Sequence, residues 1–330
     1  MKDSANQSRN TSTPIIFVVG ATATGKSQQA LKLSQQFGGV IVNGDSIQLF
    51  QSVNIGAAKP SLQEQSLVPH LLFDIVPEGE EFTAGKYRRV FYELLSDYID
   101  HPSVPFFVVG GSGFYFQAIE KGMYPVVEGE QLLKQKWTDF LLQNGGEKLF
   151  DCLLERDLEA SQKISKNDTY RVIRALTLIE SHGCTLAKVE ALFKQSADQS
   201  RLANPLLKIG FRWPKQELLK RVSLRVDQML KSGLVDEVEA LLKKGLEMWS
   251  PLNSVGYAET VEFLKKPSTL VDLKSMIVQN TMKLAKKQRT WFQRDKQIIW
   301  FDGVELEKNT GPQPDHYVKE FLLGVSQNKS

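Results

Sequence analysis

Eight residues near the N-terminus have the types and the spacing that bind phosphate groups. Gly20, Ala21, Thr22, Ala23, Thr24, Gly25, Lys26 and Ser27 follow the pattern G-x-x-x-x-G-K-[ST], between an apolar run and a helical pattern. In such a loop the backbone N–H groups converge on phosphate oxygens at the positive end of a helix. The lysine reaches the terminal phosphates and the serine hydroxyl ligates Mg²⁺. The motif predicts a bound polyphosphate with magnesium, but it does not identify the molecule that carries the phosphates.

A single carboxylate follows the second apolar run of the chain. Asp45 comes one glycine after residues 40–43. The carboxyl ends of neighbouring parallel strands face a common crevice, so we expect Asp45 to point at whatever reacts beside the phosphates. It could act there as a general base or as a metal ligand through water, or it could cap the N-terminus of a following helix. Its position in the sequence leaves both roles open.

A second glycine-rich turn, residues 110–115, directly follows the apolar run 105–109. We expect this turn at the same edge of the sheet as the phosphate loop. Its hydroxyl, Ser112, could donate a hydrogen bond to a diphosphate or to a substrate. The other interpretation is a tight turn whose glycines are required by the backbone.

The chain lacks a clear metal-binding acid of the kind that ATPases carry at the end of an apolar strand. Asp74 in the segment HLLFD is the one candidate, and Ile75 and Val76 continue the apolar run beyond it. The pattern therefore disfavours a nucleotide hydrolase.

Two stretches of the C-terminal half concentrate positive charge, although the whole chain carries only +3. Residues 281–296 interleave Trp291 and Phe292 with Lys283, Lys286, Lys287, Arg289, Arg294 and Lys296, against Asp295 alone. Residues 208–231 contain Lys208, Arg212, Lys215, Lys220, Arg221, Arg225 and Lys231, against Glu217 and Asp227. Such segregation is typical of surfaces that contact nucleic-acid phosphates, although a solvated helix face explains any single run.

The elements that must position these residues alternate between strands and helices. Apolar runs without polar alternation are typical of strands buried on both faces of a parallel sheet. The predicted strands are 15–19, 40–43, 70–76, 105–109, 206–211 and 297–301. With helical patterns between them, they predict an α/β fold, a doubly wound parallel sheet of the P-loop NTPase type.

Residues 121–204 interrupt this alternation, because apolar residues recur there at helical spacing and no strand pattern appears. We predict a helical insertion at 121–204 within a core made of residues 14–120 and 205–330, after a flexible tail at 1–13. In the insertion, Arg171 and Arg174 share one helix face. They could grip phosphates or pair with Asp168 and Glu180.

The composition excludes several classes of protein. With 42% apolar and 24% charged residues, the chain is neither disordered nor collagen-like. Cys152 and Cys184 cannot form a four-ligand zinc site, and so few thiols suit a reducing compartment. Because no run reaches roughly 18 apolar residues and the polar N-terminus has no signal core, we expect a cytoplasmic protein.

Taken together, these features make the chain similar to the tRNA dimethylallyltransferases (tRNA isopentenyltransferases), in their bacterial form, from about Ile15 to Arg294. Nine blocks in one order carry the resemblance. They are GATATGKS (20–27), DSIQLF (45–50), NIGAAKP (54–60), PHLLFD (69–74), VVGGSGFYF (108–116), NDTYRVIRAL (167–176), RVDQMLKSGLVDEV (225–238), NSVGYAE (253–259) and TMKLAKKQRTWF (281–292).

The resemblance implies transfer of a dimethylallyl group from dimethylallyl diphosphate to N6 of the adenine next to the anticodon of a tRNA. The phosphate loop, with Mg²⁺ on Ser27, would hold the departing diphosphate, which accounts for the missing hydrolase acid. Asp45 takes the role of the base for the adenine amino group. Ser112, where the family usually has threonine, contacts substrate near the reacting centre. No protein partner is implied, and we expect a monomer.

The resemblance also implies that the helical insertion and the basic C-terminal helices clasp the anticodon arm of tRNA. The positions that it assigns to tRNA contact are Asp45, Ser46, Ile47, Gln48, Ser112, Lys134, Tyr170, Arg171, Arg174, Gly256, Tyr257, Lys286, Lys287, Gln288 and Arg289. Departures from the family pattern include Ala57 for threonine, Ala258 for lysine, Met282 for arginine and Gln293 for arginine. These fall mostly on positions that face tRNA, so they concern acceptor affinity rather than phosphate chemistry.

Three other functions share parts of this pattern. An isopentenyltransferase for a free adenine nucleotide has the same chemistry but does not need two basic stretches. A P-loop small-molecule kinase shares the loop and the acid after the second strand, and it would be recognised by a lid rich in arginines. A non-catalytic RNA-binding module would be marked by an Asp45 unfit for catalysis.

Overall fold

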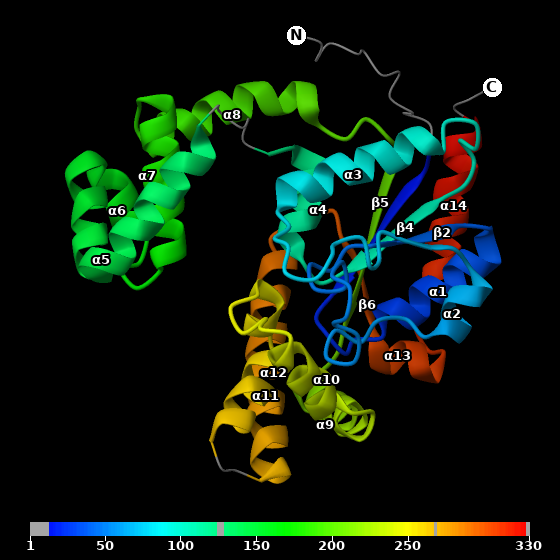
Figure 1. The fold of residues 1–330 in the computed structure, drawn as a ribbon. Helices are drawn as coiled ribbons and strands as arrows, with labels where there is room; N and C mark the ends of the chain where they lie inside the picture. The colour runs from blue at the N-terminus through cyan, green and yellow to red at the C-terminus, as the bar shows by residue number, and fades with distance from the viewer. Residues whose placement is uncertain (1–12, 124–128, 267–268, 328–330) are drawn as a thin grey trace. The chain divides into compact units, whose positions relative to one another are not determined.

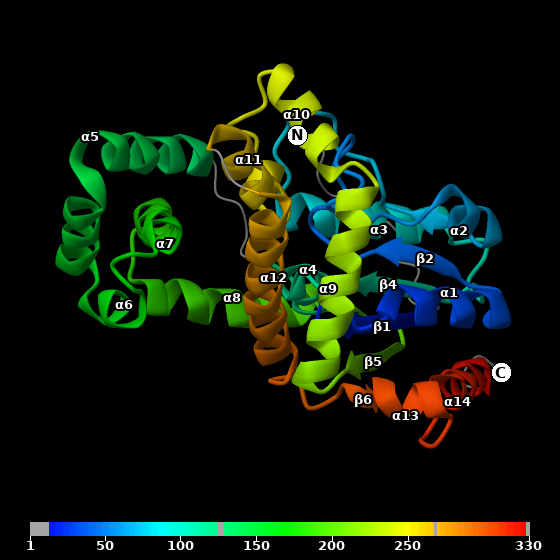
Figure 2. The same ribbon diagram turned by 90° about the horizontal axis from the view of Figure 1, so that it is seen from below.

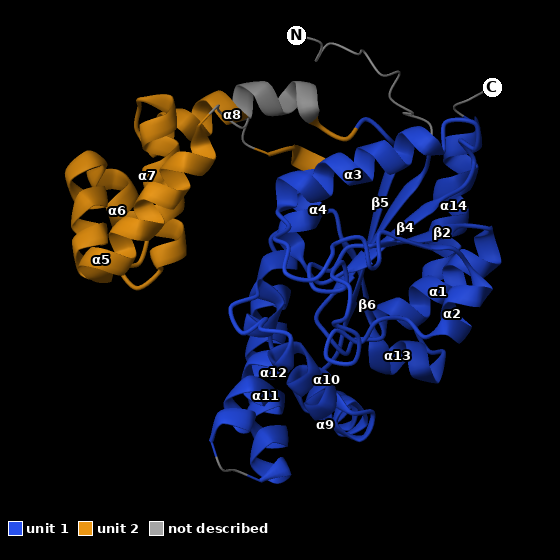
Figure 3. Ribbon diagram, viewed as in Figure 1, with its two compact units in different colours: residues 1–119, 203–330 blue, residues 120–202 orange. Residues whose placement is uncertain are grey.

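The computed structural model describes residues 13–123, 129–266 and 269–327 (Figure 1). The chain forms two compact units, residues 1–119 with 203–330 and residues 120–202 (Figure 3). All but one residue of the tail predicted at 1–13 lies outside the described residues. Among the residues that are described, no helix combines the length and the apolar character needed to cross a membrane.

The first unit is built on a six-stranded parallel sheet in the order β3-β2-β4-β1-β5-β6. The strands are β1 Ile15–Gly20, β2 Val40–Asn43, β3 His70–Leu71, β4 Phe106–Gly110, β5 Leu206–Arg212 and β6 Ile299–Asp302. β1 and β4 are buried along their whole length, which explains why their sequences show no polar alternation. The predicted doubly wound α/β fold is confirmed.

The strand predicted at 70–76 is wrong beyond Leu71. Leu72 and Asp74 adopt φ values of +60° and +55°, a left-handed conformation that ends an extended strand. The chain then returns to the sheet only through a bridge between Val76 and Phe50. The acid of HLLFD therefore lies in a turn rather than at a strand end.

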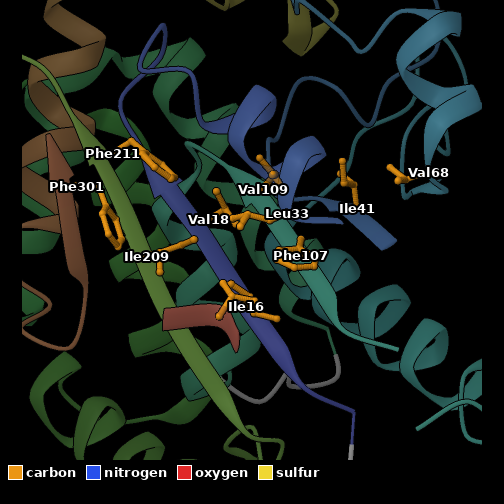
Figure 4. Packing of buried hydrophobic residues seen from close by; sticks show 12 residues of the cluster. Ile16, Val18, Leu33, Ile41, Val68, Phe107, Val109, Ile209, Phe211 and Phe301 are labelled. Carbon is orange, nitrogen blue, oxygen red and sulfur yellow. The ribbon is translucent and has the colours of Figure 1, made fainter. Parts of the chain in front are cut away.

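Helices cover both faces of the sheet. On one face Ile16 and Val18 of β1 pack into a cluster with Leu33 of α1 (Lys26–Phe37) and Val318 of α14 (Pro314–Gln327), seen in part in Figure 4. On the other face, the ring of Phe116 from α4 (Gly113–Lys121) lies 4.9 Å from that of Phe17. The remaining helices of this unit are α2 Leu62–Leu67, α3 Ala84–Asp97, α9 Lys215–Lys231, α10 Leu234–Lys243, the 3₁₀ turn η1 Ser250–Asn253, α11 Tyr257–Lys265, α12 Leu270–Phe292 and α13 Gly303–Lys308.

The long helices α9 and α12 pack side by side, as Figures 1 and 2 both show.

The second unit is built from helices in its described residues and contains α5 Glu130–Arg156, α6 Leu158–Lys163, α7 Thr169–His182 and α8 Leu186–Ser200. Its core gathers Trp137 and Leu153 of α5 with Val172 and Leu176 of α7.

Candidate active site

Three loops meet at one edge of the sheet because β2, β4 and β1 are successive neighbours. The Gly44 N–H donates to the Val109 carbonyl at 2.7 Å, which joins the loop after β2 to the end of β4. The Ser46 N–H donates to the Ser112 hydroxyl at 2.9 Å. The phosphate loop 20–27 follows the next strand, so the structure brings all three polar segments together.

The phosphate loop has the shape that its glycines allow. Gly20 and Gly25 have φ values of +151° and +84°, and a side chain on Gly20 would come within 2.7 Å of the Phe211 carbonyl. α1 begins directly after the loop, and no side chain caps its first N–H groups. These donors and the exposed Ser27 are thus available to an anionic ligand.

A side chain from α9 and one from the segment between β5 and α9 support the loop from outside. The Arg221 guanidinium donates to the Ala23 carbonyl and the Trp213 indole donates to the Thr24 carbonyl, both at 3.0 Å. Arg221 also lies over the Trp213 ring, 4.2 Å from its centroid. Two loop carbonyls are thereby engaged from outside, which helps to fix the shape of the loop.

Two cations and one carboxylate form the electrostatic centre of the site. Burial lowers the pKa of Lys26 to about 8, Asp45 opposes this effect, and Arg225 adds to it. Burial also lowers the pKa of Arg225, again against the attraction of Asp45. The Lys26 ammonium donates to the Ala21 carbonyl at 3.3 Å. Two half-buried cations beside one carboxylate leave an excess of positive charge, which a diphosphate would neutralise.

Asp45 does not cap a helix, so that interpretation is wrong. The residues that follow it form a turn, and the next helix, α2, is capped by Ser61. Instead, one Asp45 carboxylate oxygen accepts the Ile47 N–H at 3.1 Å, while the Asp45 N–H donates to the Asn43 side chain at 2.8 Å. These local bonds fix the carboxylate beside the phosphate loop.

Gln288 of α12 joins two of the three loops. Its amide oxygen accepts the Thr22 N–H at 2.8 Å, and its amide nitrogen donates to the Gly111 carbonyl at 3.1 Å. A side chain on Gly111 would lie 2.3 Å from that nitrogen, so it would push the Gln288 amide out of this position. Expected as a tRNA contact, Gln288 is turned inward onto the loops of the site.

Sequence reasoning did not single out Arg225 as a site residue, because it appeared only as one cation of a basic run. The block RVDQM, which begins at Arg225, was the one available signal. Arg225 also lines a cavity of about 520 Å³ with Asp74 and with residues of the 54–65 segment and of α9, among them Ile55, Lys59 and Met229. In that cavity Asp74 is paired with Lys59.

The basic run 208–231 is less exposed than its charge count indicates. Lys208 is only 5% exposed and binds Asp295 and Gln297 at 2.7 and 2.9 Å. With Arg221 and Arg225 also turned inward, three of the seven cations of this run stabilise the core and the site, and the other four are exposed. In 281–296, by contrast, Lys286, Lys287 and Arg289 are exposed on α12.

The other expected tRNA contacts divide by exposure. Lys134 and the 74% exposed Tyr170 lie on the helical unit. Arg171 pairs there with Asp168 at 3.3 Å, which was one of the two alternatives for this residue. Arg174 pairs with Glu130 rather than with Glu180, which instead accepts hydrogen bonds from Lys136 and Trp137.

In the first unit, Ile47 and Gln48 are half-buried, whereas Gly256 and Tyr257 are buried. The Tyr257 side chain has no exposed surface, so it is not presented to a partner.

The donor groups fit magnesium only together with a polyphosphate. The described residues contain no cluster of three or more histidine, cysteine or acidic side chains that could hold a metal alone. Ser27 would supply one hydroxyl oxygen on the first turn of α1. Magnesium commonly binds one or two protein oxygens together with phosphate oxygens and water.

The fold and the site define a P-loop α/β protein with a helical insertion, and with an acid and a hydroxyl on the two neighbouring loops at the same edge of the sheet. The IPP transferase family matches residues 48–295. A tRNA dimethylallyltransferase of Bdellovibrio bacteriovorus is 49% identical over 291 residues, covering 88% of this chain and 93% of that protein. The chain therefore belongs to the IPP transferase family.

Two further comparisons cover almost the whole chain. A tRNA dimethylallyltransferase of Microcystis aeruginosa is 37% identical over 318 residues, 96% of both proteins. The crystal structure of the full-length tRNA isopentenylpyrophosphate transferase from Bacillus halodurans superimposes with a TM-score of 0.69 at 27% identity. It covers 96% of this chain and 99% of that one.

Proposed function

We propose that the protein transfers a dimethylallyl group from dimethylallyl diphosphate to N6 of the adenine next to the anticodon of tRNA. The observation that carries the proposal is the position of the Asp45 carboxylate beside the two half-buried cations of a phosphate site, Lys26 and Arg225. That arrangement suits a reaction in which a diphosphate leaves while a proton is removed nearby. The names of the curated relatives favour tRNA as the acceptor.

The donor site consists of the phosphate loop with Lys26 and Arg225. The C–O bond to the diphosphate breaks, so negative charge builds on the leaving group, and preorganised cations and N–H groups stabilise that charge. Magnesium bound through Ser27 would neutralise further charge on the diphosphate. Lys26 must be protonated for this role, and a bound diphosphate favours its charged form.

Asp45 acts on the acceptor. An adenine amino group is a weak nucleophile, so removing its proton as the N6–C bond forms contributes about 10²–10⁴-fold to the rate. The Ser112 hydroxyl, which also lies within 3.1 Å of the Ser46 hydroxyl, holds the turn next to this carboxylate and is available to substrate.

The acceptor RNA binds through exposed cations. Lys286, Lys287 and Arg289 form a basic face on the C-terminal half of α12, and the helical unit contributes Tyr170 and Arg171. The adenine must leave its stack to enter the crevice, which is less costly in a single-stranded loop.

Incubation with labelled dimethylallyl diphosphate, Mg²⁺ and unmodified tRNA, beside AMP and ATP, tests the proposal. We expect label in tRNA, and an at least ~10²-fold slower transfer in Asp45→Asn. Asp97→Asn, on an exposed carboxylate at the end of α3 and away from the site residues, serves as the matched control. Label in AMP alone would favour the free-nucleotide enzyme, and ATP turnover would favour a kinase. Light scattering of the same purified protein tests the expectation that it is a monomer.

A further inference from the structure

Two side chains from α10 and α11 hold the loop that follows the Asp45 segment. The Glu237 carboxylate accepts the N–H groups of Asn54 at 3.0 Å, Ile55 at 2.9 Å and Gly56 at 3.3 Å. The next N–H, that of Ala57, donates to the Tyr257 hydroxyl at 3.2 Å. Four consecutive N–H groups thus point at one pair of side chains.

The pair is itself joined by a hydrogen bond. The Tyr257 hydroxyl donates to the Glu237 carboxylate at 2.6 Å, and the tyrosine ring is fully buried. A side chain on Gly56 would lie 2.5 Å from that ring, so the loop can close on the ring only through a glycine. Hydrogen bonds to a carboxylate are about twice as strong as neutral ones, which makes this a stiff attachment.

The held loop is connected to the catalytic segment through Gln48. The Gln48 amide donates to the carbonyls of Ala57 and Ala58, at 3.0 Å in each case. Gln48 lies three residues after Asp45, in the turn that the Asp45 carboxylate closes through the Ile47 N–H. Glu237 and Tyr257 are therefore connected to the Asp45 turn through the loop 54–58 and the Gln48 side chain.

The same loop forms a wall of the cavity that contains Arg225. Asn54, Ile55 and Ala58 line that cavity, opposite residues of α9. A shift of the loop would move this wall and the Asp45 turn together. Misplacement of reacting groups by about 1 Å can lower a rate by about 10²-fold.

We propose that Glu237 and Tyr257 are positioning residues that set the place of the Asp45 turn, and that Tyr257 is not a contact for RNA. The inference rests on the proposed function, since the rate it affects is that of the transfer. Within the described residues, no hydrogen bond joins Glu237 to the phosphate loop, so its effect on the reaction is indirect.

The test uses Glu237→Gln, Tyr257→Phe and their double variant in the full-length protein. Glu239→Gln is the matched control, because Glu239 lies on the same helix, is exposed, and forms an ion pair with the exposed Lys243 at 3.1 Å. We expect kcat to fall about 10-fold or more in Glu237→Gln and less in Tyr257→Phe, with KM for RNA and its salt dependence unchanged. The two effects should be non-additive, because the side chains share one hydrogen bond.

Hydrogen exchange at residues 54–57 supplies a readout that does not depend on activity. Protection of these N–H groups should decrease in both variants and stay unchanged in Glu239→Gln, provided that thermal melts show folded protein. Unchanged exchange and kcat in folded variants would overturn the inference, and so would a Tyr257→Phe defect confined to RNA affinity. If the wild-type protein shows no transfer while exchange responds as expected, the proposed function fails and the attachment of the loop stands.

Discussion

Gln288 accepts a hydrogen bond from the Thr22 N–H at 2.8 Å, which ties helix α12 to the phosphate loop across most of the sequence. The same side chain donates to Gly111, in the turn that carries Ser112. One amide therefore sets the separation of the diphosphate site from the turn expected to contact substrate. Its neighbours Lys287 and Arg289 are exposed on the same helix.

Gln288→Ala should slow the transfer about 10-fold, because both loops lose a hydrogen bond that aligns them. Lys287→Ala, one residue away and exposed, should leave kcat unchanged and weaken RNA binding instead. Steady-state kinetics with both substrates separate the two effects. A Gln288→Ala variant with normal kcat and a reduced salt dependence of RNA binding would instead identify Gln288 as an RNA contact.

Donor binding should weaken as the pH rises above about 8. Burial lowers the pKa of Lys26 from 10.5 to about 8, so the ligand-free site loses its ammonium in this range. Only the protonated form attracts diphosphate, so KM for the donor should rise up to about tenfold per pH unit well above the pKa. Calorimetric titration with diphosphate from pH 7 to 9.5 measures how the dissociation constant of diphosphate changes with pH. A flat profile would show that Lys26 keeps its proton.

Arg225→Met should raise KM for the donor by about 10²-fold, since a half-buried cation beside the proposed diphosphate site is lost. Arg212→Met, on an exposed side chain of the same basic run, is the control and should leave KM for the donor unchanged. If the two variants change donor binding and RNA binding equally, Arg225 contributes only to the general positive charge of the surface.

Arg289→Ala should reduce the slope of log K for RNA binding against log salt by about 1, as expected when one phosphate contact is removed. Lys208→Met should leave that slope unchanged, because Lys208 is buried against Asp295. It should lower the melting temperature instead. Fluorescence titration over a range of salt concentrations measures the slope for both variants. An unchanged slope in Arg289→Ala would show that the exposed cations of α12 contact solvent and not RNA.

Gly113→Ala should destabilise the protein by about 1–3 kcal/mol, because the added methyl would lie 2.1 Å from the Trp291 ring. Gly324→Ala, in α14 where nothing lies within 4 Å, should stabilise it by about 0.5–1 kcal/mol. Urea unfolding of both variants measures the difference. Equal midpoints would mean that α12 moves away from the turn at little cost.

The sequence by itself determined the local parts of the site. The phosphate loop is contiguous, so its glycines, its lysine and the helix N-terminus that it needs all lie within eight residues. The apolar runs determined five of the six strands, because a strand buried on both faces leaves an unmistakable composition. The sixth, at 70–76, was overestimated because apolar composition does not reveal the left-handed turn at Leu72.

Only the tertiary structure decided which distant side chains meet. The strand order and the packing of α9 to α12 against the loops bring Gln288, Arg225 and Tyr257 to the loops of the site. The periodicity of apolar residues in the sequence does not encode those contacts. A count of charges also treats Lys208 and Arg289 alike, although burial and an ion pair remove the first from the surface. Motifs follow from short-range geometry, whereas partners and burial depend on contacts between segments far apart in the chain.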